Sequence, residues 1–135
     1  MKKSIAVIGN GFVGGSLTTV MSEKGFDVYV YDKAGNLAVG GKPPPGSGKH
    51  GLQGLVDCCE QQVTNFSGIY FVCVPTPMYE DGSCDTSIVE GVLKELSEVS
   101  GKRIAVVKST VPPGSTERWN KMFEGTGLNV VFCPE

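Results

Sequence analysis

A glycine-rich segment near the start of the chain and an aspartate that follows it have the residue types needed to bind a dinucleotide. Residues 9–14 read Gly-Asn-Gly-Phe-Val-Gly and fit the pattern G-x-G-x-x-G. In such a segment Gly9 permits a tight turn, Gly11 lets a pyrophosphate approach the backbone, and Gly14 lets a helix pack close to its strand. The free N–H groups and the positive dipole end of that helix would face the phosphates. Asp32 is placed to accept hydrogen bonds from both hydroxyls of a ribose.

The acid favours NAD over NADP, because a carboxylate would repel a 2′-phosphate. Lys33 beside it weakens that preference. Flavin nucleotides and S-adenosylmethionine also bind at glycine-rich first loops with an acid after the second strand, so the motif alone leaves these ligands open. A glycine-rich turn without a ligand is a further interpretation of the same residues.

The elements that would position these residues alternate between apolar runs and amphipathic stretches, which is typical of βα units and a parallel sheet. The pattern therefore predicts an α/β fold in a single domain, residues 1–135. Strands are expected over residues 4–8, 27–31, 69–74, 103–108 and 128–133; helices are expected over 12–24, 88–96 and from Pro112 to 123, with a weaker helical pattern over 52–62.

The segment over residues 35–51 is predicted to be a loop insertion, because it holds three consecutive prolines and many glycines. It only superficially resembles a P-loop. Gly48-Lys49 would need a glycine where Pro43 stands, and serine or threonine in place of His50.

Composition excludes several classes of function. The 135 residues carry a formal net charge of −2 and no block of basic residues, so we expect no nucleic-acid partner. No apolar run approaches the roughly 18 residues of a membrane span, so no membrane association is expected. The five cysteines lack a regular spacing and His50 is the sole histidine, which favours reduced thiols in the cytoplasm and no metal site.

Three later segments narrow the interpretation. Residues 71–77 read F-V-C-V-P-T-P, residues 107–116 read V-K-S-T-V-P-P-G-S-T, and residues 131–135 read V-F-C-P-E. Together with the glycine-rich start, they resemble the N-terminal NAD-binding domain of the UDP-glucose/GDP-mannose dehydrogenase family. The resemblance covers most of the chain apart from about residues 35–67. It implies a Rossmann-type doubly wound parallel sheet with five main strands, ordered 2-1-3-4-5 along the chain's own numbering, with the second strand near an edge.

The resemblance also implies a chemistry. Family members oxidise C6 of a nucleotide sugar from alcohol to acid, reduce two NAD molecules in succession, and form a covalent intermediate on a cysteine thiol. The family's nucleophilic cysteine, its central and C-terminal domains, and most contacts to the sugar and to a dimer partner would lie beyond Glu135. We therefore expect these residues to bind NAD weakly and to turn over nothing alone. The alternative is a stand-alone, non-catalytic dinucleotide-binding module.

The resemblance also implies site residues, by matching positions of this chain to the motifs of the family. The resemblance implies that Thr110 orients water or the reacting groups near the nicotinamide, and that Glu135 takes part in the hydrolytic half. The alternative for Thr110 is that it simply ends a strand and caps the next helix. The predicted catalytic residues are Thr110 and Glu135, and the predicted cofactor-binding residues are Gly9, Gly11, Phe12, Val13, Gly14, Asp32, Lys33, Val74, Pro75, Thr76, Ser109 and Thr110.

The interval after Asp32 departs from the family pattern. The position at which family members carry a basic residue is occupied by Leu37, and only residues 63–66 are left as a remnant of the usual third strand.

Overall fold

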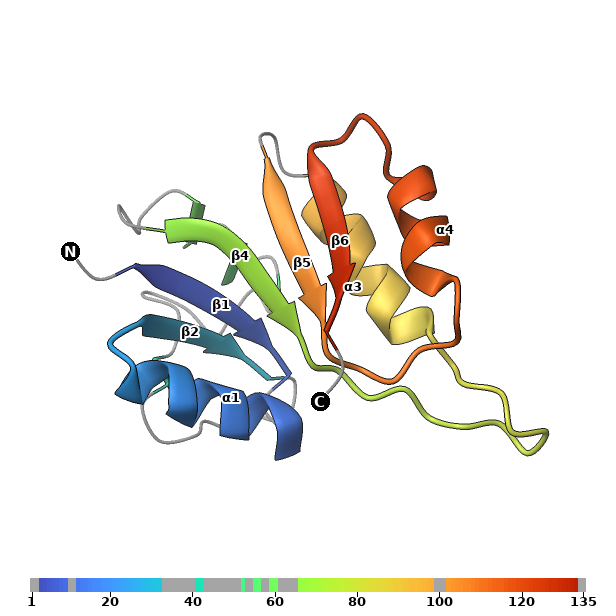
Figure 1. Ribbon diagram of the computed structural model, residues 1–135, viewed down its shortest axis with the longest axis horizontal. Helices are drawn as coiled ribbons and strands as arrows, with labels where there is room; N and C mark the ends of the chain where they lie inside the picture. Colours follow the sequence, from blue (N-terminus) through green and yellow to red (C-terminus); the bar gives the residue numbers. More distant parts are fainter. Residues whose placement is uncertain are drawn as a thin grey trace.

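The structure is a computed structural model that describes residues 3–9, 12–32, 41–42, 52, 55–56, 59–60, 66–98 and 102–133. Within these residues, six parallel strands form one sheet in the order β3-β2-β1-β4-β5-β6 (Figure 1). The strands are β1 (Ser4–Ile8), β2 (Asp27–Tyr31), β3 (Gly41–Lys42), β4 (Phe66–Val72), β5 (Arg103–Val107) and β6 (Leu128–Phe132), and the helices are α1 (Phe12–Glu23), α3 (Ser87–Ser97) and α4 (Ser115–Met122).

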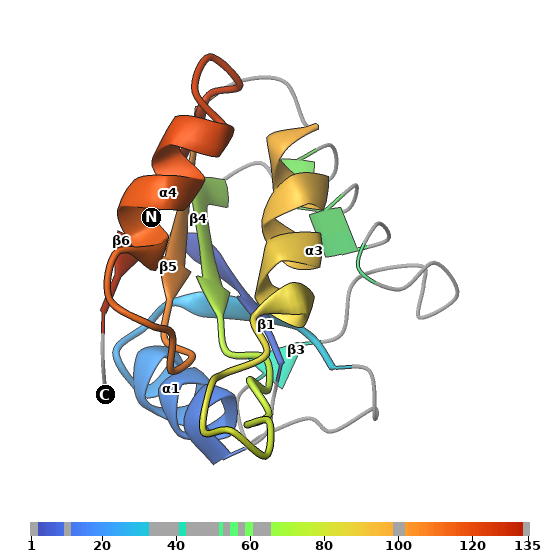
Figure 2. The same ribbon diagram turned by 90° about the vertical axis from the view of Figure 1, so that its right-hand side faces the viewer.

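The helices lie on opposite faces of the sheet, and the handedness of the connections explains why. From β1 the chain passes through α1 to β2, in one direction across the sheet, whereas β4, β5 and β6 follow one another in the other direction. Because both connections are right-handed crossovers, α1 covers one face and α3 and α4 cover the other (Figures 1 and 2). The predicted order of the five main strands is confirmed, and the chain reverses direction between β1 and β4, where ligands bind in such sheets.

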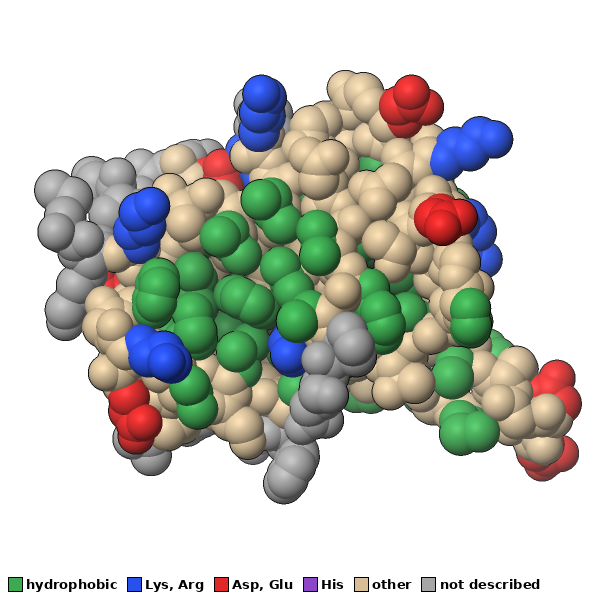
Figure 3. Space-filling model, viewed as in Figure 1, with side chains coloured by type: hydrophobic (Ala, Val, Ile, Leu, Met, Phe, Trp, Pro, Cys, Tyr) green, Lys and Arg blue, Asp and Glu red, His purple; other side chains and the backbone are tan. Residues whose placement is uncertain are grey.

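The two faces of β4, β5 and β6 differ in burial. Side chains under α3 and α4 are almost completely enclosed, and they include Trp119, the single tryptophan of the chain. On the opposite face, Ile104 and Val131 remain 39% and 47% exposed, and Figure 3 shows an apolar patch on that side of the molecule. A smaller cluster lies beneath α1. The larger core contains Tyr70, Val72, Leu93, Ala105, Val107, Trp119 and Val130, and the smaller contains Ile5, Val7, Val28 and Val30.

A polar cluster fixes the start of β5 within the larger core. The guanidinium of Arg103, which is 5% exposed, forms an ion pair with Glu60, and the hydroxyl of Tyr70 donates a hydrogen bond of 2.7 Å to the other oxygen of the same carboxylate. Burial raises the pKa of Tyr70 well above its usual value, and the hydrogen bond to Glu60 raises it further.

Two expectations about secondary structure need correction, and a third is supported. A further strand, the two-residue β3, lies inside the predicted loop. Phe66, the last residue of the suggested remnant, opens β4, and residues 63–65 lie outside the described residues. β3 pairs with β2 only through the backbone of Gly41–Lys42, which has no alternating side-chain pattern to reveal it. The last helix begins at Ser115 and not at Pro112, because Gly114 has a φ of 85° and therefore cannot continue a helix. The weak pattern over 52–62 is supported, since each residue described there is helical.

Candidate functional site

The carboxyl ends of β1, β2 and β4 meet at one edge of the sheet and are tied there by hydrogen bonds. The Gly9 N–H donates to the Tyr31 carbonyl at 2.7 Å, and the Cys73 N–H donates to the Ile8 carbonyl at 2.8 Å. These bonds continue the parallel ladders one residue past each strand. Gly9 and Asp32, which are distant in sequence, are thereby held at the same edge.

The two described glycines of the G-x-G-x-x-G segment lack side chains for steric reasons. A Cβ on Gly9, whose φ is 91°, would stand 2.7 Å from the Cys73 carbonyl oxygen. A Cβ on Gly14 would stand 1.8 Å from the Gly9 carbonyl oxygen. The first turn of α1 therefore packs directly on the turn that follows β1, as predicted for a phosphate-binding loop.

Beside this edge lies a pocket of about 730 Å³, which is within the size range of cofactor sites. Its walls are mostly apolar, and two acids, Asp32 and Glu95, line it among the described residues. The lining comes from the three strand ends, from α3 and from Leu52: Ile8, Gly9, Tyr31, Asp32, Leu52, Val74, Pro75, Ile88, Gly91, Val92 and Glu95.

Helix α3 presents one stripe to this pocket. Ile88, Gly91, Val92 and Glu95 are spaced three, four and seven residues apart and so share one side of the helix. No atom lies within 4 Å of the place where a Cβ on Gly91 would stand, so this glycine leaves the stripe open.

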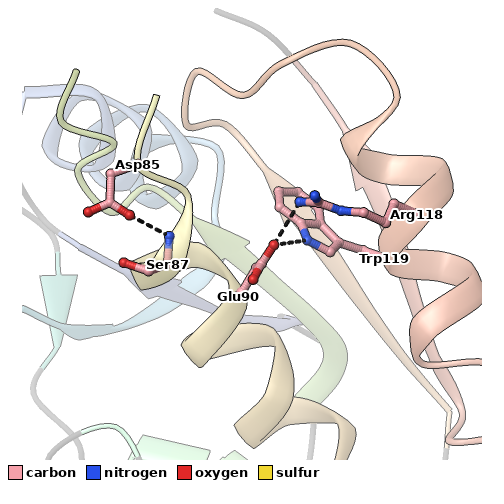
Figure 4. A network of polar contacts seen from close by, with 5 residues as sticks. All are labelled: Asp85, Ser87, Glu90, Arg118 and Trp119. Carbon is pink, nitrogen blue, oxygen red and sulfur yellow. Dashed lines mark hydrogen bonds and ion pairs between the residues drawn. The ribbon is translucent and has the colours of Figure 1, made fainter. Parts of the chain in front are cut away.

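The start of α3 is fixed by a side chain from the preceding loop. The Ser87 N–H donates a hydrogen bond of 2.9 Å to the Asp85 carboxylate (Figure 4). Hydrogen bonding by the Ser87 side chain, and then by its backbone, lowers the pKa of Asp85. The negative charge lies at the positive end of the helix dipole, which stabilises the helix start.

The other end of the network in Figure 4 joins α3 to α4. Glu90 accepts hydrogen bonds from the Arg118 guanidinium at 2.7 Å and from the Trp119 indole Nε1 at 3.1 Å. These contacts satisfy the polar atom of a completely buried tryptophan and fix α3 against its neighbour.

Ser109 and Thr110 follow β5 at the same edge of the sheet, but neither lines the pocket. Ser109 is buried, and its hydroxyl donates to the Val74 carbonyl at 2.7 Å. Thr110 is exposed. Ser109 therefore holds the segment that follows β4, in which Val74 and Pro75 line the pocket while the half-buried Thr76 does not.

Two sets of residues remain: those that the sequence predicts for the site, and those that the pocket adds to it. Gly11, Lys33, Glu135 and the side chain of Phe12 lie outside the described residues, and Val13 is half-buried in the first turn of α1. Leu52, Ile88, Gly91, Val92 and Glu95 were not predicted as pocket residues. The sequence signal for this set is the spacing of Ile88 and Val92, which predicts that the two side chains lie on the same face of α3.

The described residues fit an adenine dinucleotide. The glycine turn at the end of β1 allows a backbone approach, the apolar pocket has room for a base, and Asp32 supplies a carboxylate beside it. The model of the NAD-binding domain of the UDP-glucose/GDP-mannose dehydrogenase family matches residues 52–135. The chain belongs to this family.

Relatives of this dehydrogenase-family chain match nearly its whole length. The UDP-N-acetyl-D-mannosamine dehydrogenase of Pyrococcus horikoshii is 29% identical over 92% of the chain, and the UDP-glucose 6-dehydrogenase TuaD of Bacillus subtilis is 33% identical over 84%. The structure of a UDP-glucose dehydrogenase from Pyrobaculum islandicum covers 100% of the chain with a TM-score of 0.66 and 26% identity. The chain spans 32%, 27% and 36% of these three proteins, about a third of each.

Two further observations concern the described part of this family member. None of its helices has the length and apolar character needed to cross a bilayer. None of its His, Cys, Asp and Glu side chains gather in threes as a metal site would require.

Proposed function

We propose that this chain binds NAD as the cofactor-binding part of a nucleotide-sugar 6-dehydrogenase, which oxidises UDP-glucose or a similar sugar nucleotide to the uronic acid. The observation that supports this most directly is that Gly9 and Asp32 line one pocket at the carboxyl edge of the sheet. The family membership and the names of the relatives agree with it.

Each described group has a definite part in this proposal. The turn at Gly9 and the first N–H groups of α1 bind the pyrophosphate, and the carboxylate of Asp32 accepts hydrogen bonds from the adenosine ribose. When bound, NAD would supply the acceptor for the hydride removed from the sugar. Ser109 acts as a positioning residue, because its hydroxyl is bonded to the Val74 carbonyl.

Thr110 and Glu135 remain the proposed catalytic residues. Thr110 follows β5, the strand next to β4, at the carboxyl edge of the sheet. Oxidation of the sugar, and the homodimer proposed for the longer protein, require the parts of the relatives that this chain does not span. We propose that the 135 residues alone bind NAD without turnover, in the cytoplasm.

Titration calorimetry of the chain with NAD, NADP and S-adenosylmethionine tests the proposal. We expect NAD to bind most tightly. Replacing Asp32 by Asn should weaken NAD binding about 10- to 100-fold, since a hydrogen bond to a charged group contributes roughly 1.5–3 kcal/mol. The matched control is Asp81→Asn, which removes the same charge from an exposed loop away from the pocket and should leave affinity unchanged. Preference for the methyl donor, or no binding of NAD, would refute the proposal.

A further inference from the structure

Glu95 is an acid among mostly apolar side chains, and the interactions within the described residues do not explain why an acid stands there. Its side chain lines the pocket together with Leu52, Ile88 and Val92. One carboxylate oxygen, Oε2, is enclosed, and none of the groups in the described part of the chain donates a hydrogen bond to it.

An enclosed acceptor without a donor is costly. Desolvation of such a group typically costs about 1–3 kcal/mol, and more when the group is charged. Almost all buried polar atoms in proteins have a partner, so an exception that lines a pocket indicates a donor that arrives with a ligand. The terminal torsion of a glutamate side chain is broad, so the carboxylate can rotate to turn this oxygen toward a ligand.

The position of Glu95 in the pocket indicates which part of a ligand it meets. It lies seven residues beyond Ile88 on the same stripe of α3, roughly 10 Å along the helix axis. Apolar side chains lie on the stripe and across from it, and Gly91 leaves open space between them. Such walls suit the two faces of a flat aromatic base, and a carboxylate suits an edge of that base bearing hydrogen-bond donors.

We propose that Glu95 reads the base of the dinucleotide by accepting a hydrogen bond from the exocyclic amine of adenine. This inference rests on the proposed function, because it assumes that Asp32 binds the ribose attached to that base. Adenine offers an N–H donor at the position where hypoxanthine has a carbonyl oxygen, and a carboxylate repels that oxygen. Glu95 therefore makes the pocket selective for adenine within a lining that is otherwise nonspecific.

Nicotinamide hypoxanthine dinucleotide is the probe, because its base has a carbonyl oxygen in place of this amine and a proton on the adjacent N1, while its ribose, pyrophosphate and nicotinamide are those of NAD. Calorimetry of the 135-residue chain should show NAD binding about tenfold or more tightly than the hypoxanthine analogue. The variant Glu95→Gln replaces one acceptor oxygen by an N–H donor of the same shape, so the ratio should fall to one or reverse. The variant Glu95→Leu should bind both dinucleotides equally.

Glu98→Gln is the matched control, since Glu98 is an exposed acid that follows the same helix outside the pocket. It should keep the selectivity of the original chain. Equal affinity of the unaltered chain for the two dinucleotides, or an unchanged ratio in Glu95→Gln, would overturn the role of Glu95 while leaving NAD binding in place. If neither dinucleotide bound the unaltered chain, the proposed function itself would fail.

Discussion

The contact between Gly14 and Gly9 gives the sharpest test of how the first helix is held. In the variant Gly14→Ala the added methyl carbon would lie 1.8 Å from the Gly9 carbonyl oxygen, whereas real contacts of this kind are essentially never below 3.0 Å. The atoms must separate by 3.0 − 1.8 = 1.2 Å at least. The obstructing atom belongs to the backbone, and the Gly9 N–H is bonded to Tyr31, so no side chain can rotate away to make room. Helix α1 itself has to move.

The expected cost follows from this displacement. Forcing one extra carbon into a tightly packed site typically costs about 1–3 kcal/mol. Replacing glycine by alanine within a helix returns about 0.5–1 kcal/mol through backbone entropy. Because the methyl carbon must move at least 1.2 Å away from a backbone atom, the cost of overpacking in Gly14→Ala should lie in the upper part of this range. After the gain in backbone entropy is subtracted, we expect a net destabilisation of about 1–2.5 kcal/mol.

Urea unfolding followed by the fluorescence of Trp119, which is completely buried in the folded chain, measures the effect. The control is Gly91→Ala, which also lies within a helix but where the methyl group meets no atom within 4 Å. The two substitutions should shift the midpoint in opposite directions, Gly14→Ala downward and Gly91→Ala upward. A Gly14→Ala midpoint equal to or above that of the unaltered chain would show that the turn after β1 is not tightly packed, and the steric reasoning would be refuted.

Two other predictions concern the polar groups of the larger core. Because the pKa of Tyr70 is raised in the folded chain, its contribution to stability is complete below about pH 10 and is lost as the pH rises further, by roughly 1.4 kcal/mol per pH unit. Urea titrations from pH 9 to pH 11 should show this loss in the unaltered chain and not in Tyr70→Phe; parallel losses in both would contradict it. Glu90→Leu leaves the indole N–H of Trp119 without an acceptor and should cost about 1–3 kcal/mol. Arg118→Ala removes the exposed ion pair and the contact of the guanidinium with the Trp119 ring, 5.8 Å from its centroid, but keeps the indole hydrogen bond. It should cost about 1 kcal/mol, less than Glu90→Leu, so equal losses in these two variants would show that the indole bond contributes nothing.

Much of the sheet was predictable because its strands are short apolar runs that end at residues with distinct backbone requirements. β1 stops where Gly9 takes a φ of 91°, and the prediction for β2 ended at Tyr31, as in the structure. The strand β3 was not predictable in the same way. It consists of Gly41–Lys42, pairs only with β2 and has no side-chain alternation, so its existence depends on backbone hydrogen bonds that a residue pattern cannot express.

The candidate site divides along a similar line. The sequence could predict that Gly9 and Asp32 lie together, because their placement depends on local backbone and on the order of two strands. Glu95 could not be predicted in this way, because the amphipathic pattern of α3 is set by Val89, Val92, Leu93 and Leu96, which are buried in the core, and Glu95 lies at the margin of that stripe. A residue at such a margin faces solvent or a ligand according to what stands opposite. Here Leu52, distant in sequence, lines the same pocket. The position of Glu95, which we propose binds the adenine base, is thus set by tertiary packing and not by a sequence motif. Selectivity between two nearly identical dinucleotides therefore tests its role more directly than the glycine-rich motif can.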